Sequence, residues 1–497
     1  MAANFPNSIL RRIGGIVRLL PVVALAVACG GGGGGEPQRV VTSVTVSSPI
    51  STPKQGDTVQ LSAVARDQFG DVIPDTTASW SVSDAAIAAV SATGLLRTYA
   101  TGTVQATATI GGVSGALPLT VSAIKVGVTI GTTREVVFDY TTDRCHELDL
   151  PDGPARVVRA EDGSLVLFAT DAPRNYLSRG ADFSSLKRDC SHPVLESADL
   201  ETPDSFENQE WLWTVYREGS RWHALIHNEF HDPIASTCMP GNTTPANPCW
   251  YNSITYAVST DGALVFRKPR PPAHVVAPPP DRWVPPSTSV PPGQWAAEGY
   301  RNPTNIVRAA DGYFYSFFNS ITRQGVQGLC AMRTSNLDDP SSWRAWNGSG
   351  FSLRMTSPYV TGTSAPACTS LDMPLGMAHV VYNSYLQRYV AVQNGERELA
   401  GRLVCGFYFA LSADLVHWSE PQLLVETWWA PYCSANPNGP SVLEPLPVSA
   451  PSIVDHADIT INFEKAGQTP HLYYTRFNDG GNDRDVVRVP ITFTRID

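Results

Sequence analysis

The chain has little charge and no excess of basic residues. Only 16% of its 497 residues are charged, and the formal net charge is -10. Because phosphate binding needs a basic surface, this balance argues against a nucleic-acid partner. With 42% hydrophobic residues the sequence is also too apolar for a disordered chain. The composition predicts a folded protein, and its length favours two or more domains.

Several local patterns are missing as well. No apolar run reaches the roughly 20 residues that a membrane-spanning helix needs. No two cysteines are close enough in sequence to form the Cys pairs typical of structural zinc sites. The sequence has no Gly-rich phosphate loop between a strand and a helix and no Gly-x-Ser-x-Gly turn. Neither nucleotide binding nor serine-hydrolase chemistry is therefore indicated, and no cofactor is expected.

The first 28 residues have the pattern of a targeting segment. A basic region that includes Arg11, Arg12 and Arg18 precedes a short apolar run from Leu19 to Val27. Small residues then lead to Cys29. The run is too short to span a bilayer, so we exclude residues 1–28 from the folded domains.

The end of this segment carries a resemblance. Leu25-Ala26-Val27-Ala28-Cys29 resembles the lipobox of bacterial lipoproteins, with the leucine one position farther from the cysteine than usual. The resemblance implies that acylated Cys29 anchors the protein to the cell envelope, at the outer membrane or cell surface, with no other membrane contact. A Gly-rich tether follows at residues 29–38. Plain secretion after cleavage near Ala28 is the alternative.

Cysteine usage agrees with export. Eight cysteines remain after Cys29, all beyond residue 140, and this even number predicts four disulfides. The sequence does not fix their pairing. Cys238 and Cys249 bracket one loop, and proximity along the chain favours the other three pairs: Cys145–Cys190, Cys330–Cys368 and Cys405–Cys433.

Residues 39–122 form a first β-rich domain. Val59, Leu61, Ala63 and Ala65 alternate with polar residues, as in a half-buried strand. Further strand and turn patterns follow up to residue 108, in an order and spacing similar to the group 2 bacterial immunoglobulin-like domain. The resemblance implies an immunoglobulin-like β-sandwich that serves as a spacer or adhesive unit, without a catalytic site.

The remaining residues, 134–497, repeat one pattern five times. Each unit has an apolar strand, a turn, a second apolar strand, and a polar turn with an aromatic residue. Five units of four short strands predict a five-bladed β-propeller, so the whole chain is expected to be all-β. The expected innermost strands are 155–159, 211–215, 305–307, 377–381 and 459–463.

Propeller geometry predicts one shared site. The start of each innermost strand and the end of the next strand lie on the same face, so their residues converge on one funnel. The strand starts carry Asp152, Glu207, Glu210, Arg301, Asn302, Asp372, Asp455 and His456. The second-strand ends carry Asp171, Arg174, His227, Glu229, Asn319, Glu396, Arg397, Arg476 and Asn478. Carboxylates and guanidiniums beside aromatic rings suit a polyhydroxylated ligand.

Three short motifs resemble the five-bladed glycosidases, a group that includes arabinanases, β-xylosidases, invertases and levansucrases. They are Asp152-Gly153-Pro154, the Gly-Tyr-Phe-Tyr stretch at 312–315, and Ser412-Ala413-Asp414-Leu415 with Trp418. The resemblance implies that the first-blade aspartate is the base or nucleophile, a second-blade aspartate orients the pair, and a third-blade glutamate is the acid. Only the first has a clear counterpart, Asp152. Glu229 and His227 lie nearest the second position, and Glu298 lies just before the third.

We therefore expect a glycoside hydrolase that acts on a polysaccharide or oligosaccharide. Asp152 would be the base or nucleophile, and Glu229 or Glu298 would be the acid. The expected substrate ligands are Arg174, His227, Arg301, Asn302, Asp455, His456 and Arg476. The alternative is a non-catalytic glycan-binding or adhesion protein with the same funnel, which the missing third-blade glutamate favours.

A metal site is a further alternative within the second blade. His223, His227 and His231 alternate along one strand, so their side chains would share one face. The identity of any bound metal is not indicated.

Overall fold

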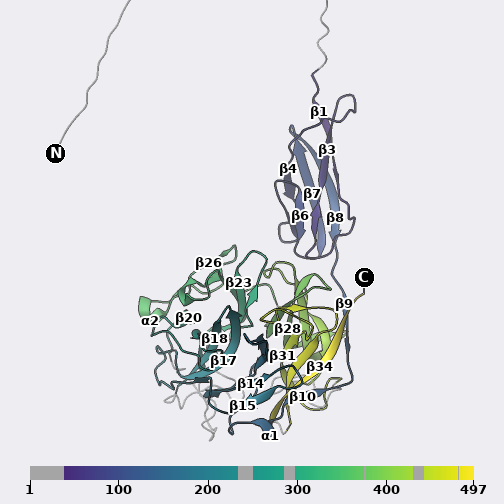
Figure 1. The fold of residues 1–497 in the computed structure, drawn as a ribbon. Helices are drawn as coiled ribbons and strands as arrows, with labels where there is room; N and C mark the ends of the chain where they lie inside the picture. Colours follow the sequence, from purple (N-terminus) through teal and green to yellow (C-terminus); the bar gives the residue numbers. More distant parts are fainter. Residues whose placement is uncertain are drawn as a thin grey trace, which may run out of the picture.

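The computed structural model describes residues 38–232, 250–284, 297–373, 376–428, 442–478 and 481–496. A small β-module and a larger ring of β-sheets are visible in Figure 1. Helix is confined to α1 (Tyr140–Asp143), α2 (Pro358–Thr361) and the 3-10 turn η1 (Pro340–Ser342) in these ranges. None of the helices in the described ranges is long and apolar enough to cross a membrane. Cys29, the targeting segment and most of the tether lie outside the described residues.

The small module is a sandwich of short antiparallel strands. Its strands are β1 (Val41–Ser47), β2 (Thr58–Gln60), β3 (Ser62–Asp67), β4 (Ser79–Val82), β5 (Ala88–Val90), β6 (Leu95–Thr98), β7 (Gly102–Ile110) and β8 (Val113–Val121). They form the sheets β1-β3, β2-β6-β5 and β4-β7-β8. Trp80 packs against both apolar clusters of this module. The alternation of apolar residues along the strands buries one side of each sheet.

The larger body is a five-bladed β-propeller. Blade 1 contains β11 (Arg156–Arg159), β12 (Leu165–Phe168), β14 (Leu177–Gly180) and β15 (Lys187–Asp189). Blade 2 contains β17 (Gln209–Glu218), β18 (Arg221–His231), β19 (Trp250–Ser259) and β20 (Val275–Ala277). Blade 3 contains β21 (Ala297–Arg301), β22 (Val307–Arg308), β23 (Phe314–Ile321), β24 (Gln327–Thr334), β25 (Arg344–Trp346) and β26 (Phe351–Leu353).

The last two blades complete the ring. Blade 4 contains β27 (His379–Asn383), β28 (Arg388–Leu399), β29 (Arg402–Ser412) and β30 (Gln422–Glu426). Blade 5 contains β31 (Val448–Val454), β33 (His471–Phe477), β34 (Arg484–Arg495) and β10 (Glu135–Phe138). Four short strands add to these sheets or lie beside them. β9 (Val126–Ile130) pairs with β34, and β32 (Lys465–Ala466) pairs with β27. β13 (Arg174–Asn175) and β16 (Leu195–Glu196) pair with each other as a two-stranded ribbon.

The two ends of the propeller meet in blade 5. β10 comes before blade 1 in the sequence but pairs with β34, the last strand of the chain. Pairing the first and last strands in one sheet covers an edge that would otherwise be exposed. The ring is therefore closed by hydrogen bonds between segments about 350 residues apart, as for Glu135 and Arg488.

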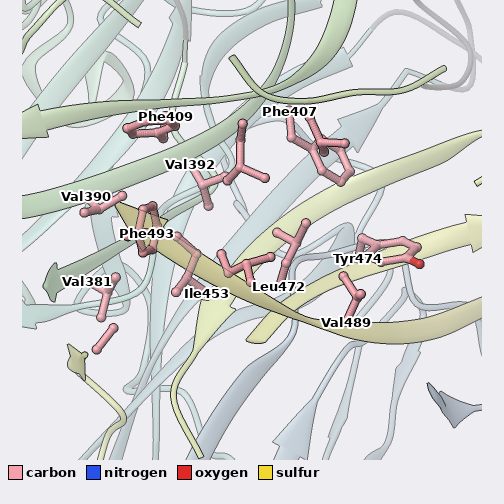
Figure 2. Close-up of a cluster of buried hydrophobic side chains, with 14 of the residues drawn as sticks. Val381, Val390, Val392, Phe407, Phe409, Ile453, Leu472, Tyr474, Val489 and Phe493 are labelled. Carbon is pink, nitrogen blue, oxygen red and sulfur yellow. The ribbon is translucent and has the colours of Figure 1, made fainter. Parts of the chain in front are cut away.

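Five apolar clusters fill the five interfaces between neighbouring blades. They join blades 1 and 2, 2 and 3, 3 and 4, 4 and 5, and 5 and 1. Figure 2 shows the cluster between blades 4 and 5, where Val392 and Phe409 face Ile453 and Leu472. Both faces of each sheet are thus buried, which explains why the strands have near-continuous apolar runs.

The structure corrects the prediction for blade 5. The innermost strand is β31, not residues 459–463, which form no strand. Asp458 accepts hydrogen bonds from the backbone N–H groups of Thr460 and Lys465 and so holds that segment in a loop. Since Val448 at the start of β31 pairs with Arg476, the funnel end of the blade is there. Asp455 and His456 follow the other end of β31 and lie away from the funnel.

The predicted pairs Cys145–Cys190 and Cys330–Cys368 are both disulfides in the structure. Cys405 is also disulfide-bonded. Cys238, Cys249 and Cys433 lie outside the described residues, so the other two pairings stay predictions.

A buried ion pair holds the start of the propeller together. The carboxylate of Asp149 and the guanidinium of Arg188 have side-chain exposures of 0% and 2%, and they form two hydrogen bonds. Asp149 also accepts from the backbone N–H of Cys145, and the guanidinium lies 5.0 Å from the ring centroid of Phe138. The pair thus connects the segment before blade 1, the outer strand β15 and the closing strand β10.

The immunoglobulin-like module contacts blade 4. Asp57 forms an ion pair of 2.8 Å with Arg388, and the rings of Tyr99 and His417 stack with centroids 4.1 Å apart. These contacts come from loops at one end of the module and from the outer turns of blade 4. The module is therefore seated on the propeller by polar and aromatic contacts.

Candidate functional site

Two carboxylic side chains emerge at the same end of the inner strands of blade 1. Asp152 lies four residues before the start of β11, and Asp171 lies three residues after the end of β12. Arg156 and Phe168, at these two strand ends, are paired in the ladder. The two carboxyl groups are near enough that the charge of Asp152 raises the pKa of Asp171. Blade 1 thus places a pair of carboxyl groups at the mouth of the funnel.

The two carboxyl groups have opposite environments. Asp152 has a side-chain exposure of 40% and forms an ion pair with Arg484. Asp171 is only 8% exposed and accepts hydrogen bonds from the indole N–H of Trp211, at 2.6 Å, and from the N–H of Ala172. Burial, and then the charge of Asp152, raise the pKa of Asp171 well above its usual value. Asp171 is therefore the member of the pair that holds a proton more strongly than an ordinary aspartate does.

Two tryptophans on β17 form the adjoining wall. The ladder between β17 and β18 has an irregularity between Leu212 and Thr214, so Trp213 is the extra residue of a bulge. As a result Trp211 and Trp213 both contact His227, with ring centroids 5.4 and 5.2 Å apart. Trp213 also packs over Gly153, beside Asp152. The half-buried indole of Trp213 offers an apolar face beside Asp152.

Glu229 is held by two histidines of its own strand. One of its oxygens lies 2.8 Å from Nε2 of His227, and the other lies 2.9 Å from Nε2 of His231. Burial raises the pKa of Glu229, but the hydrogen bonds and charges of these histidines outweigh it and lower the pKa to about 2. Glu229 is therefore ionised at neutral pH and has no proton to give to a leaving group, which is unfavourable for the predicted role as acid.

The low pKa of Glu229 predicts a dependence of stability on pH. Because the pKa is about 2 in the folded protein and near 4.5 without these contacts, the stabilisation is complete above pH 4.5 and is lost as the pH falls toward 2. We expect the unfolding free energy of Glu229→Gln, measured by urea denaturation, to fall less steeply than that of the wild type as the pH is lowered through this window. The exposed control Glu201→Gln should show the same dependence of unfolding free energy on pH as the wild type. An equal dependence in Glu229→Gln and in the wild type would contradict the low pKa of Glu229.

Blades 3 and 4 contribute amides and a guanidinium. Arg301 pairs with Asn319 at the end of β21, and the backbone N–H of Asn302 donates to Nδ1 of His227 at 3.2 Å. A Cβ atom on Gly376 would lie 2.5 Å from Oδ1 of Asn319 and 3.2 Å from Nε2 of Gln393. Gly376 is thus required for the close approach of the chain to both amides. The backbone of Asn302 thus lies beside the imidazole of His227, and Arg301 precedes it in the chain.

Other predicted residues lie apart from this cluster or are engaged elsewhere. Glu298 is buried and forms two hydrogen bonds of 3.0 Å with Arg323, away from Asp152. Arg174 is exposed and pairs with Glu196 on the short ribbon. Arg476 lies at the funnel end of blade 5 and forms an ion pair of 2.7 Å with Asp485.

The structure also bears on the metal alternative. Nδ1 of His223 lies 2.7 Å from the hydroxyl of Tyr256, at the opposite end of β18 from His231. Burial lowers the pKa of His223 to about 4. In the ranges that the structure describes, no three His, Cys, Asp or Glu side chains are grouped so that they could hold a metal ion.

Three important residues of the site were not identified as such from the sequence. Asp171 was expected in the ring but was given no catalytic role. Trp213 reaches the site through a bulge, and Arg484 reaches it from β34, the third strand of blade 5 counted from the axis. Only Asp171 had a usable signal, because it follows the second strand of the blade that contains Asp152.

Comparison with protein families and with curated sequences gives a match for the small β-module only. The model of the bacterial Ig-like domain (group 2) matches residues 40–121. A search of curated protein sequences found no match.

The propeller resembles solved structures at low identity. A protein of unknown function from Dyadobacter fermentans has 11% identity and a TM-score of 0.38, with 74% of this chain and 100% of that chain covered. An endo-arabinase from Bacteroides thetaiotaomicron has 12% identity and a TM-score of 0.37, with 73% and 98% covered. The α-L-arabinanase of Cellvibrio cellulosa, complexed with arabinohexaose, has 12% identity and a TM-score of 0.33, with 69% and 91% covered. Scores this low carry no argument about activity.

Proposed function

We propose that the propeller is a glycoside hydrolase that cleaves a polysaccharide or oligosaccharide in its funnel. The observation that carries this proposal is the pair Asp152 and Asp171, which lie close together in opposite environments. Hydrolysis of a glycosidic bond uses two neighbouring carboxyl groups, and the raised pKa of Asp171 suits the one that gives a proton.

The proposed roles follow from these environments. The proton of Asp171 passes to the oxygen of the leaving sugar as the glycosidic bond breaks. The carboxylate of Asp152 attacks the anomeric carbon or removes a proton from the attacking water. Asp171 thus takes the role of acid that the sequence suggested for Glu229 or Glu298.

The rest of the site supports binding of a sugar. Trp213 offers an apolar face for stacking beside Asp152. Arg301, Asn319 and Gln393 supply donors and acceptors for hydroxyl groups. Glu229 keeps a positioning role, because it orients His227 between the two tryptophans and the backbone of Asn302.

A test of the acid role uses the variant Asp171→Asn. We expect kcat/KM on a cleavable glycan to fall by about 10²–10⁴-fold, and far less on an aryl glycoside whose nitrophenolate leaves without a proton. In the wild type, kcat/KM should decline as the pH rises through the raised pKa of Asp171, and this limb should disappear in the variant.

The control for this test is Asp182→Asn, which changes an exposed turn carboxylate of the same blade. This variant should have the same kcat/KM as the wild type on the glycan and on the aryl glycoside. Equal losses on the glycan and on the aryl glycoside in Asp171→Asn would contradict the role of Asp171 as acid.

A non-catalytic glycan-binding or adhesion protein is the second candidate. The engagement of Glu229 by two histidines favours it, because Glu229 holds no proton for a leaving group. Binding of a glycan by the wild type, with no cleavage of any glycan or aryl glycoside, would support this candidate.

We also propose that the protein is exported and held at the cell envelope by acylated Cys29. The disulfides in the propeller support export, because such bonds persist in oxidising compartments. In this arrangement the immunoglobulin-like module is a spacer between the anchor and the propeller. Retention of Cys29→Ala in the detergent phase of a partition assay would contradict the anchor.

A further inference from the structure

A buried guanidinium lies on the propeller axis. Arg156 begins β11, the innermost strand of blade 1, and the residue is only 3% exposed. Its Nη2 donates to the carbonyl oxygen of Ala378 at 2.8 Å, immediately before β27, the innermost strand of blade 4. Blades 1 and 4 are not neighbours in a ring of five, because the apolar clusters join blade 1 only to blades 2 and 5. The side chain therefore crosses the central channel.

This guanidinium has no counter-charge among the described residues. Its Nε and Nη1 atoms are buried, and no described group accepts a hydrogen bond from them. Burial alone lowers the pKa of Arg156, to about 9, so the group stays cationic at neutral pH. A buried cation with two unpaired nitrogen atoms is costly unless an anion or an equivalent acceptor accompanies it.

The neighbouring groups are neutral. His379 begins β27, next to Ala378, and its Nδ1 accepts from the backbone N–H of Ile453 at 3.5 Å, which leaves the ring hydrogen on Nε2. Burial, and then the charge of Arg156, hold the pKa of His379 well below its usual value. The neighbouring imidazole therefore supplies no negative charge, and its Nε2–H is a donor.

We propose that the propeller axis binds a small monovalent anion of the halide class, chloride being the natural occupant, at Nε and Nη1 of Arg156. The two unpaired N–H groups supply direct ligands, and a single negative charge balances the guanidinium. The burial of the site excludes a sugar or a polyatomic carboxylate. The bound anion fixes the start of β11 against blade 4, four residues after Asp152. This inference does not depend on the proposed hydrolase activity.

Bromide provides a direct test with the full-length protein. In crystals grown or soaked in sodium bromide, we expect an anomalous difference peak within hydrogen-bond distance of Nε and Nη1 of Arg156. A peak there supports the anion site. Water or empty density at this position at high bromide concentration overturns it.

A solution experiment gives an independent reading. At constant ionic strength, replacing sodium gluconate by sodium bromide should raise the unfolding midpoint of the wild type saturably, on the order of 2 °C. Arg156→Met should lose this response, whereas Arg179→Met, which removes a partly buried guanidinium of β14, should retain it. A response that Arg156→Met retains would contradict the proposal. If Arg156→Met does not fold, the bromide peak in the wild type decides.

Discussion

Replacement of Asp152 by asparagine is expected to reduce kcat on a cleavable glycan by about 10³-fold or more, equivalent to about 4 kcal/mol of activation free energy. Asparagine keeps the size of the side chain but removes the negative charge that attacks the sugar or activates water. Stability should change little, because the partner Arg484 is near enough to the surface to be solvated. Steady-state kinetics with a glycan substrate measure the effect.

The control for Asp152 is Asp162→Asn, which alters an exposed turn carboxylate of the same blade that hydrogen-bonds Ser164. This variant should retain wild-type kcat. Glycan affinity of Asp152→Asn, measured by calorimetry, should stay near that of the wild type because the stacking wall is unchanged. Near-normal turnover by Asp152→Asn would remove this residue from the mechanism.

Removal of the Asp149 carboxylate should have the largest effect on stability. Asp149→Ala leaves the guanidinium of Arg188 buried without its partner, and breaking a buried pair in this way costs about 3–5 kcal/mol. The loss should be concentrated in the propeller, since the pair connects blade 1 with the closing strand β10. Urea denaturation followed by tryptophan fluorescence measures the change in unfolding free energy.

The matched control is Asp189→Ala on β15, the outer strand that carries Arg188. Asp189 lies 4.0 Å from Arg179 in a partly exposed pair, which contributes at most about 1 kcal/mol. A loss in Asp149→Ala no larger than that in Asp189→Ala would show that the buried pair does not support ring closure.

The architecture could largely be predicted from the sequence, because strand alternation and repeated turns are local signals. The exception was the innermost strand of blade 5. β31 contains Pro451, and the ladder is irregular between Ser449 and Ser452, where Ala450 has a positive φ of 52°. Residues 459–463 were expected to be this strand because their apolar residues alternate with polar ones. A bulge accommodates the proline, and strand patterns do not reveal it.

The sequence carries less information about the chemistry of the candidate site than about its place in the fold. Strand ends predict that Asp152, Asp171, His227 and Arg301 face one funnel, because a propeller brings such ends together. Which carboxyl group has a raised pKa depends on burial and on neighbouring charges, as for Asp171 beside Asp152. The engagement of Glu229 by His231 likewise depends on side-chain geometry that strand patterns do not carry.

Release of reducing ends from a panel of plant and microbial polysaccharides tests the central claim most directly. We expect the wild type to release reducing ends from at least one glycan, and Asp152→Asn to release none at a detectable rate while still binding that glycan. Binding of a glycan by the wild type, with no reducing ends released from any member of the panel, would contradict the hydrolase assignment.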